Sequence, residues 1–153
     1  MGFLNSTDLQ AIGFRCLGEN VQISDAAKIY GSEQISIGSN VRIDDFCILS
    51  AGVGGIEVGD HVHIACYSSL IGQGLIRLED FCGLSARVSI YSSTDDYSGS
   101  ALTNPTVPRS LRNVKSGPVV LRKHVIVGVG CLILPQTQSA PQSPPDQKVL
   151  YAP

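Results

Sequence analysis

Residues 58–74 read VGDHVHIACYSSLIGQG and carry two of the three histidines of the chain. Val58, Ile64 and Leu70 stand six positions apart, a spacing that matches neither the helical period nor the alternation of a half-buried strand. A chain with an aliphatic residue at every sixth position can turn a corner after each short strand. The stretch therefore indicates a repeating coil rather than a helical bundle.

The same six-residue period extends over most of the chain. Fifteen hexads can be written, and the first position of each is aliphatic. They form five coils that start at Leu17, Ile37, Val58, Leu78 and Leu121. The fifth position is mostly small or β-branched, Val53 included, with Glu33 as the exception, so both positions are expected inside a triangular prism of stacked coils. We expect parallel strands near residues 21–23, 41–43, 47–49, 62–64, 82–84, 88–90 and 125–127. The sequence thus predicts an all-β domain, a parallel β-helix, over residues 17–135.

Three segments fall outside the repeat. Residues 1–16 predict a short helix, with Ser6 or Thr7 as its N-cap, that covers the open first coil. Between the fourth and fifth coils, residues 96–118 are rich in Ser, Asn, Pro and Gly and predict one long excursion loop. Residues 136–153 lack the period and predict an irregular Pro-rich tail.

Composition excludes several classes of protein. The net charge is −2 and the eleven basic residues form no run, which argues against nucleic-acid binding. No apolar run approaches the roughly 20 residues of a membrane span. The five cysteines form no C-x-x-C pair and no zinc-binding spacing, so we expect buried, reduced thiols in a cytoplasmic protein.

Two stretches sharpen this interpretation: VSIYSSTDDYSG at residues 88–99 and GPVVLRKHVIVGVGCLILP at residues 117–135. They resemble the hexapeptide-repeat acyltransferases, in particular galactoside-type sugar O-acetyltransferases and nucleotide-amino-sugar acetyltransferases. The resemblance implies a left-handed prism, a homotrimer, and acetyl-CoA bound as acyl donor along the cleft between two prisms. It implies a hydroxyl or amine of a sugar or nucleotide-linked sugar as acceptor, in cell-surface polysaccharide synthesis.

The resemblance also bears on the end of the chain. Such relatives continue for another coil or two, so the Pro-rich tail predicts a truncated prism. In that case the last coil would leave Leu121, Val127 and Ile133 exposed.

Acyl transfer from a thioester requires a base for the acceptor and fixed donors for the tetrahedral intermediate, but no protein nucleophile. His63 is a candidate catalytic base, because it takes an outward position on the flank expected to carry the loop. Asp95 and Asp96 are the other catalytic candidates, since they stand where maltose-type relatives carry a histidine. A carboxylate ordinarily titrates near pH 4, so these aspartates alternatively bind sugar hydroxyls, orient a neighbouring subunit's histidine or deprotonate an amino sugar. An amine is the easier nucleophile, which favours N-acylation.

Further residues complete the expected site. The candidate substrate-binding residues are Ser93, Tyr97 and Asn104. The candidate acyl-CoA-binding residues are Ser85, Gly128 and Gly130. The two glycines stand at tight corners, where pantetheine can approach the backbone.

Two other readings of the sequence stay open. A metal enzyme on the same fold, like the left-handed-helix carbonic anhydrases, needs three converging histidines. His61 and His63 share a corner, whereas His124 is several coils away, and His61 and His124 are expected to face water, so we expect no metal site. A non-catalytic remnant of the acyltransferase fold is the second alternative.

Overall fold

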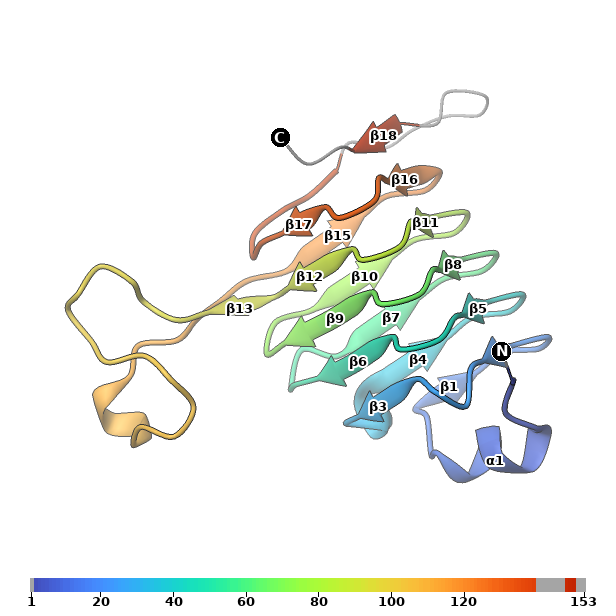
Figure 1. Cartoon of the computed structure of the whole chain (residues 1–153), viewed down its shortest axis with the longest axis horizontal. Coiled ribbons are helices and arrows are strands. Elements are labelled where there is room, and N and C mark those ends of the chain that lie inside the picture. The colour runs from blue at the N-terminus through green and yellow to red at the C-terminus, as the bar shows by residue number, and fades with distance from the viewer. Residues whose placement is uncertain (1, 140–147, 151–153) are drawn as a thin grey trace.

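The computed structural model describes residues 2–139 and 148–150. Short strands follow one another around a prism, and each coil pairs with the next through parallel strands (Figure 1). Leu17 pairs with Ile37, Ile37 with Val58, and Val58 with Leu78. The structure confirms the predicted all-β fold, a left-handed parallel β-helix with one short α-helix.

Three parallel sheets form the faces of the prism. The first sheet contains β1 (Cys16–Leu17), β4 (Ile35–Ile37), β7 (Ile56–Val58), β10 (Ile76–Leu78) and β15 (Val119–Leu121). The second sheet contains β2 (Gln22–Ile23), β5 (Arg42–Ile43), β8 (His63–Ile64), β11 (Gly83–Leu84), β16 (Val125–Val127) and β18 (Lys148–Leu150). The third sheet contains β3 (Lys28–Tyr30), β6 (Ile48–Ala51), β9 (Ser69–Gly72), β12 (Ser89–Tyr91) and β17 (Leu132–Ile133). Each strand range expected from the sequence overlaps a strand of the second or third sheet.

The core follows the hexad register. Of the fifteen first-position residues, all but Leu17 and Ile29 are buried. Four more aliphatic residues are buried, each two positions before the first residue of the second, third, fourth or fifth coil. They are Ile35, Ile56, Ile76 and Val119. Val53, expected inside, is 87% exposed. The second coil, which contains Val53, is one residue longer than the coils beside it. The chain turns outward at Val53, just before Gly55, which has a φ of 79°.

The corners of the prism hold non-glycine residues in the left-handed backbone region. At the corner between the first and second sheets these residues are Asn20, Asn40, His61, Phe81 and His124. At the corner between the second and third sheets they are Phe46, Tyr67 and Arg87. Tyr67 stacks on Phe46 at 4.9 Å, and the Arg87 guanidinium lies 5.8 Å from the Tyr67 ring. Such backbone costs about 1–2 kcal/mol per residue, and stacking between successive corners offsets part of that cost.

A short helix lies beside the first coil. Helix α1 (Ser6–Ala11) starts at Asn5, whose side chain accepts a hydrogen bond from the Asp8 amide at 3.0 Å. The N-cap is therefore Asn5 rather than the predicted Ser6 or Thr7. Leu9 of this helix is 8% exposed and joins the core cluster. A one-turn helix, η1 (Ser32–Gln34), lies between β3 and β4.

The excursion loop leaves the prism after β12. Strands β13 (Ser93–Thr94) and β14 (Lys115–Ser116) form an antiparallel hairpin at its base. Residues 95–114, which we call the arm, project away from the stacked coils and contain η2 (Arg109–Leu111) (Figure 1). The hairpin begins three residues before the predicted loop start at 96.

The last coil differs from the expectation of an irregular tail. Strand β18 pairs in parallel with β16, with Val127 opposite Leu150. The prediction of an irregular tail is therefore wrong for residues 148–150, and residues 140–147 and 151–153 lie outside the described residues. Leu121 and Val127, expected to be exposed, are 0% exposed, and Ile133 is 6% exposed. No helix within residues 2–139 is long and apolar enough to cross a membrane.

Candidate functional site

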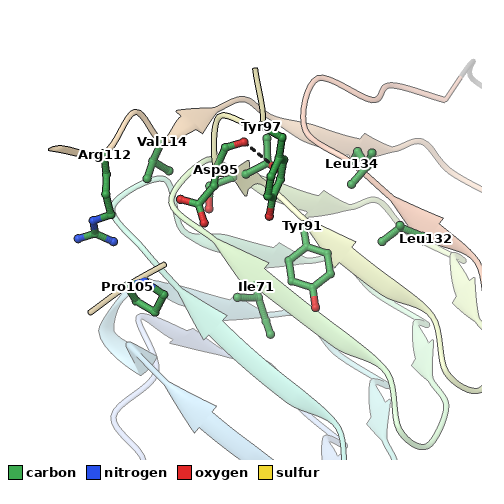
Figure 2. A pocket seen from close by; sticks show the side chains of 11 residues that line it. Ile71, Tyr91, Asp95, Tyr97, Pro105, Arg112, Val114, Leu132 and Leu134 are labelled. Carbon is green, nitrogen blue, oxygen red and sulfur yellow. Dashed lines mark hydrogen bonds between the residues drawn. The ribbon is translucent and has the colours of Figure 1, made fainter. Parts of the chain in front are cut away.

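A cavity lies between the arm and the outer face of the third sheet. Its volume is about 700 Å³. The sheet contributes apolar side chains, and the arm and its base contribute polar ones (Figure 2). The lining residues are Ile71, Tyr91, Ser93, Thr94, Asp95, Tyr97, Pro105, Arg112, Val114, Leu132 and Leu134. We call this space the arm cavity. An apolar cavity with a few convergent polar groups is a typical small-molecule site.

Three predicted site residues line the arm cavity, namely Ser93, Asp95 and Tyr97. The Asp95 carboxylate lies between Arg112 on one side and Tyr97 on the other (Figure 2). The backbone amide of Asn104 donates a long hydrogen bond of 3.4 Å to Asp95 Oδ2. The Asn104 side chain is engaged within the arm, where its Oδ1 accepts hydrogen bonds from Thr106. Asn104 therefore positions Asp95 through its backbone.

Asp96 is turned away from the cavity and is 5% exposed. Its carboxylate accepts hydrogen bonds from the Ser98 amide and from the Asn113 side chain, and Lys115 lies 3.8 Å away. These hydrogen bonds hold the pKa of Asp96 well below its usual range. A carboxylate that binds its proton so weakly is a poor general base. Asp96 is thus tied to other residues of the arm and its base.

A second space, of about 500 Å³, lies on the outer face of the second sheet. His61, His63 and Ser85 line it, and Gly83 forms part of its floor. A Cβ at Gly83 would come within 2.9 Å of Ile126 Cδ1, so the missing side chain creates the hollow beside His63. We call this space the sheet groove. No partner for the Ser85 hydroxyl is found within the described residues.

His63 is held by a carboxylate on the coil below. Its Nε2 atom lies 2.9 Å from Oδ2 of Asp44, while Oδ1 of Asp44 accepts a hydrogen bond from Arg42 Nε at 2.7 Å. Burial alone would raise the pKa of Asp44, but the hydrogen bonds from Arg42 and His63 outweigh it and lower that pKa. An ionised carboxylate only accepts hydrogen bonds, so Nε2 of His63 carries a proton. In an imidazole that is protonated on Nε2 alone, Nδ1 is the nitrogen that can accept a proton.

The other two histidines belong to a stack of rings. His61 and Phe81 lie 5.0 Å apart, Phe81 and His124 lie 5.1 Å apart, and the planes are nearly parallel. Phe81 stands between the two imidazoles, so the histidines cannot share one metal ion. Within residues 2–139 and 148–150, no three metal-binding side chains are grouped to hold an ion.

The cysteines offer no nucleophile in the core. Burial raises the pKa of the Cys47 and Cys82 thiols to about 11, so both are protonated at neutral pH. Cys131 is also buried, whereas Cys16 is exposed and Cys66 is half-buried. The expectation of buried thiols is thus wrong for Cys16.

The two glycines predicted to bind acyl-CoA follow β16 at a corner of the fifth coil. Gly130 has φ 74° and nothing near the place of a Cβ, so its corner is open. Gly128 is buried directly after Val127. The corner lies above Ser85 and Arg87 of the preceding coil, because the Gly130 amide donates to the Ala86 carbonyl at 3.1 Å.

The structure does not gather all candidates at one place within a single chain. Asp95 stands on the arm beside the third sheet, whereas His63 and Ser85 stand on the second sheet. The expectation that His63 shares a flank with the loop is therefore wrong. Sequence reasoning missed Asp44, which the register of β5 against β8 places beside His63. It also missed Arg112, although PRSLRNVK at residues 108–115 is the most basic stretch of the arm.

Comparisons with known proteins extend this description. No protein-family model matches the chain. A dTDP-4-amino-4,6-dideoxy-D-glucose acyltransferase of Escherichia coli is 53% identical over 135 residues, which cover 88% of this chain and 70% of that protein. AntD, an N-acyltransferase from Bacillus cereus, has a crystal structure with dTDP and 3-hydroxybutyryl-CoA. It is 47% identical with a TM-score of 0.83, covering 88% of this chain and 70% of that one.

Variants of AntD have also been solved. A serine-to-alanine variant in complex with dTDP-4-amino-4,6-dideoxyglucose and coenzyme A is 46% identical, with a TM-score of 0.83 over 88% of this chain and 71% of that one. An aspartate-to-asparagine variant in complex with dTDP and coenzyme A is 46% identical, with a TM-score of 0.83 over 88% of this chain and 72% of that one. In AntD the replaced aspartate stands ten positions after the replaced serine.

Proposed function

Since the chain belongs to the hexapeptide-repeat acyltransferases, in the group that includes dTDP-amino-sugar acyltransferases, we propose that it acylates the amine of a dTDP-linked amino sugar from acyl-CoA. The observation that carries the proposal is a pair of residues. In this chain Ser85 and Asp95 stand ten positions apart, as do the serine and aspartate replaced in AntD. Each lines one of the two spaces described above.

The acceptor occupies the arm cavity in this proposal. Asp95 accepts a hydrogen bond from the sugar amine, and Ser93 and Tyr97 lie close enough along the same wall to contact the sugar. The apolar sheet residues Ile71 and Tyr91 give the sugar ring a surface to pack on. The relatives act on an amino sugar, in keeping with the expectation of N-acylation.

The donor occupies the sheet groove. Gly83 leaves room on the groove floor beside His63 and Ser85, and the open corner at Gly130 lets a pantetheine chain approach the backbone. The sequence predicted acetyl-CoA, whereas AntD was solved with 3-hydroxybutyryl-CoA, so the length of the acyl chain is part of the test.

The chemistry follows from these two ligands. The neutral amine attacks the thioester carbonyl carbon and forms a C–N bond, and the carbonyl oxygen takes the negative charge of the tetrahedral intermediate. His63 Nδ1 accepts the proton that the amine loses. The intermediate then collapses, the C–S bond breaks, and the leaving CoA thiolate takes up the proton held by His63, which restores the neutral imidazole. The Ser85 hydroxyl is placed to donate a hydrogen bond to the intermediate.

An assembly of several copies brings the two spaces together. The arm projects from the prism and exposes Tyr97, Leu102 and Leu111. Leu132 of the third sheet and Leu134, just after that sheet, are also exposed. Exposed apolar residues of this extent are typical of protein interfaces. We propose a homotrimer in which the arm of one copy reaches the sheet groove of the next. Asp95 of one copy and Ser85 of another then belong to one site.

The cellular setting belongs to the same proposal. Cysteines without disulfide bonds fit a reducing compartment, so we place the enzyme in the cytoplasm. Its acylated product serves the synthesis of a cell-surface polysaccharide.

Mixed variants test the proposal directly. The wild-type chain is assayed for thiol release with acetyl-CoA or 3-hydroxybutyryl-CoA and a dTDP-linked 4-amino sugar. Ser85→Ala and Asp95→Asn are each expected to lose most of the activity, and unfolding and refolding them together is expected to restore part of it. A wild-type chain that releases no thiol with any amino sugar disproves the function. Variants that fail to complement each other disprove the shared site.

A further inference from the structure

The outer face of the second sheet carries a row of side chains that is interrupted at one position. The parallel register places Arg42, His63, Gly83 and Ile126 on successive coils of this row. Neighbouring strands lie about 4.8 Å apart, so the backbones at His63 and Ile126 are separated by roughly 10 Å, and the residue between them has no side chain. The hollow at Gly83 is therefore a gap of one side chain within the row.

Apolar side chains bound the hollow at Gly83. Cδ1 of Ile126 lies 2.9 Å from the place that a Cβ would take at Gly83. Phe81 lines the same groove two positions before Gly83. Its ring is stacked between the imidazoles of His61 and His124, at 5.0 and 5.1 Å. The stack on both faces holds the ring in place, so Phe81 is a fixed wall, whereas the end of Ile126 is flexible.

The proposed reaction places the thioester beside this hollow. His63 takes the proton of the amine and Ser85 donates to the intermediate, so the reacting carbonyl carbon lies between these two side chains. Gly83 is opposite His63 in the register, and it faces outward with Ser85 because Leu84 between them is buried. The pantetheine chain leaves the thioester toward the open corner at Gly130. The acyl chain then takes the other direction, over Gly83.

The size and chemistry of the hollow select the acyl chain. Among the described residues, the lining of the sheet groove contains no Asp, Glu, Lys or Arg, and Ala65 and Phe81 add apolar surface to it. One missing side chain leaves room for about three or four carbons, the size of a valine or leucine side chain. A butyryl chain fits such a space, whereas a hexanoyl chain meets Ile126 or Phe81.

We propose that Gly83 and Ile126 determine the length of the acyl chain that the enzyme accepts, which is a short chain of up to about four carbons packed over Gly83 against Cδ1 of Ile126. The inference rests on the proposed function, which places the donor in the sheet groove, and adds to it the class of acyl group and two specificity-determining residues. Both residues act by contact with the acyl chain and take no part in the proton transfer.

Calorimetric titration of the full chain with CoA, acetyl-CoA, butyryl-CoA and hexanoyl-CoA tests the inference. Gly83→Ala fills the hollow and is expected to weaken butyryl-CoA binding about tenfold, with the smallest change for CoA, which has no acyl chain. Ile126→Val removes Cδ1 and is expected to improve hexanoyl-CoA binding about tenfold relative to butyryl-CoA. Ile48→Val is the matched control, because Ile48 lies on the outer face of the third sheet and is 37% exposed.

The double variant tests whether the two residues share one space. In Gly83→Ala/Ile126→Val the added Cβ takes the place of the removed Cδ1, so the preference among acyl chains is expected to return toward that of the wild type. If the effects of the two changes on that preference simply add without compensation, the shared space is refuted. Ile126→Val, which only shortens a side chain in the groove, tests the same contact if Gly83→Ala does not fold.

Binding and transfer separate this inference from the proposed function. A wild-type chain that binds hexanoyl-CoA as tightly as butyryl-CoA overturns the inference, and so does one that binds no acyl-CoA. An unchanged preference in both folded single variants overturns it as well. A chain that binds acyl-CoA with the expected preference but acylates no dTDP-linked amino sugar refutes the proposed function alone. A chain that transfers acetyl and hexanoyl groups with equal kcat/KM refutes the length limit alone.

Discussion

Nε2 of His63 lies 2.9 Å from Oδ2 of Asp44, and the two residues belong to successive coils of the second sheet. The Asp44 side chain is 9% exposed, whereas that of His63 is 51% exposed, so a buried carboxylate orients an accessible imidazole. The arrangement fixes the tautomer of His63, whose ring lines the sheet groove.

Replacement of His63 is expected to remove general-base catalysis. His63→Gln should lower kcat by about 10²- to 10⁴-fold, which is the usual contribution of a positioned base. Its neighbour His61, which stacks on Phe81 in the same groove, provides the matched control. His61→Gln should lower kcat far less, as measured by steady-state thiol release. Equal losses in the two variants would transfer the role of base to Asp95.

Replacement of Asp44 is expected to act through His63. In Asp44→Asn the amide can present either an oxygen or an NH₂ group to Nε2, so the tautomer of His63 is no longer fixed. We expect kcat to fall by about tenfold with little change in KM, and the acid limb of the pH–rate profile to shift. An Asp44→Asn enzyme with the wild-type pH profile would show that the carboxylate has only a structural role.

The two adjacent aspartates of the arm are expected to give opposite results. Asp95→Asn should abolish most activity without loosening the arm, because within the described residues the Asp95 carboxylate accepts only one long hydrogen bond from the arm. Asp96→Asn should loosen the arm, because Asp96 binds Ser98, Ser100 and Asn113. Limited trypsin digestion after Arg109 and Arg112 measures the loosening. Faster digestion of Asp95→Asn than of Asp96→Asn would contradict these assignments.

The low pKa of Asp96 fixes the sign of a pH effect. Its folded-state pKa lies below the value near 3.9 of an unfolded chain, so its contribution is complete above about pH 5 and is lost as the pH falls through the folded-state value. The difference in arm protection between the wild type and Asp96→Asn should therefore be constant from pH 8 to pH 5 and shrink in acid. Hydrogen exchange of the arm amides measures it, and a difference that grows in acid would have the wrong sign.

Filling the hollow at Gly83 is expected to weaken ligand binding without destabilising the fold. A Cβ there meets only the flexible end of Ile126, so Gly83→Ala should fold with a thermal midpoint close to that of the wild type. The added methyl group occupies the groove floor, and we expect the KM for acyl-CoA to rise about tenfold, which corresponds to 1.4 kcal/mol. An unchanged KM would place the donor elsewhere.

The prism was predictable because its signal repeats. The burial of Ile23, Ile43 and Ile64 follows from the hexads alone, since each coil buries the same positions against its neighbours. The strands of the first sheet were not among the expected ranges. Their first residues, such as Ile35 and Ile76, fall in the two or three spare positions that end each coil and lie outside the hexads.

The candidate site was only partly predictable. Ser93, Asp95 and Tyr97 do line one cavity, because they follow one another at the start of the arm. The different roles of Asp95 and Asp96 depend on which way each side chain turns, which no local pattern specifies. The pairing of His63 with Asp44 depends on register between coils, and the place of Arg112 in the arm cavity depends on the tertiary path of the arm.

The register of the coils also constrains how the chain can fold. Neighbouring coils pair residues 20 or 21 positions apart, as Ile37 does with Val58, but Leu78 must find Leu121 across the arm. Doubling a loop adds only about 0.6 kcal/mol of closure entropy, yet this step comes before any contact of the last coil can form. The first four coils can therefore pair one after another along the chain. The arm divides the chain into a unit that folds early and a unit that folds late. A synthesising ribosome would release the prism up to Tyr91 as a stack of four coils, with the fifth coil docking onto it afterwards.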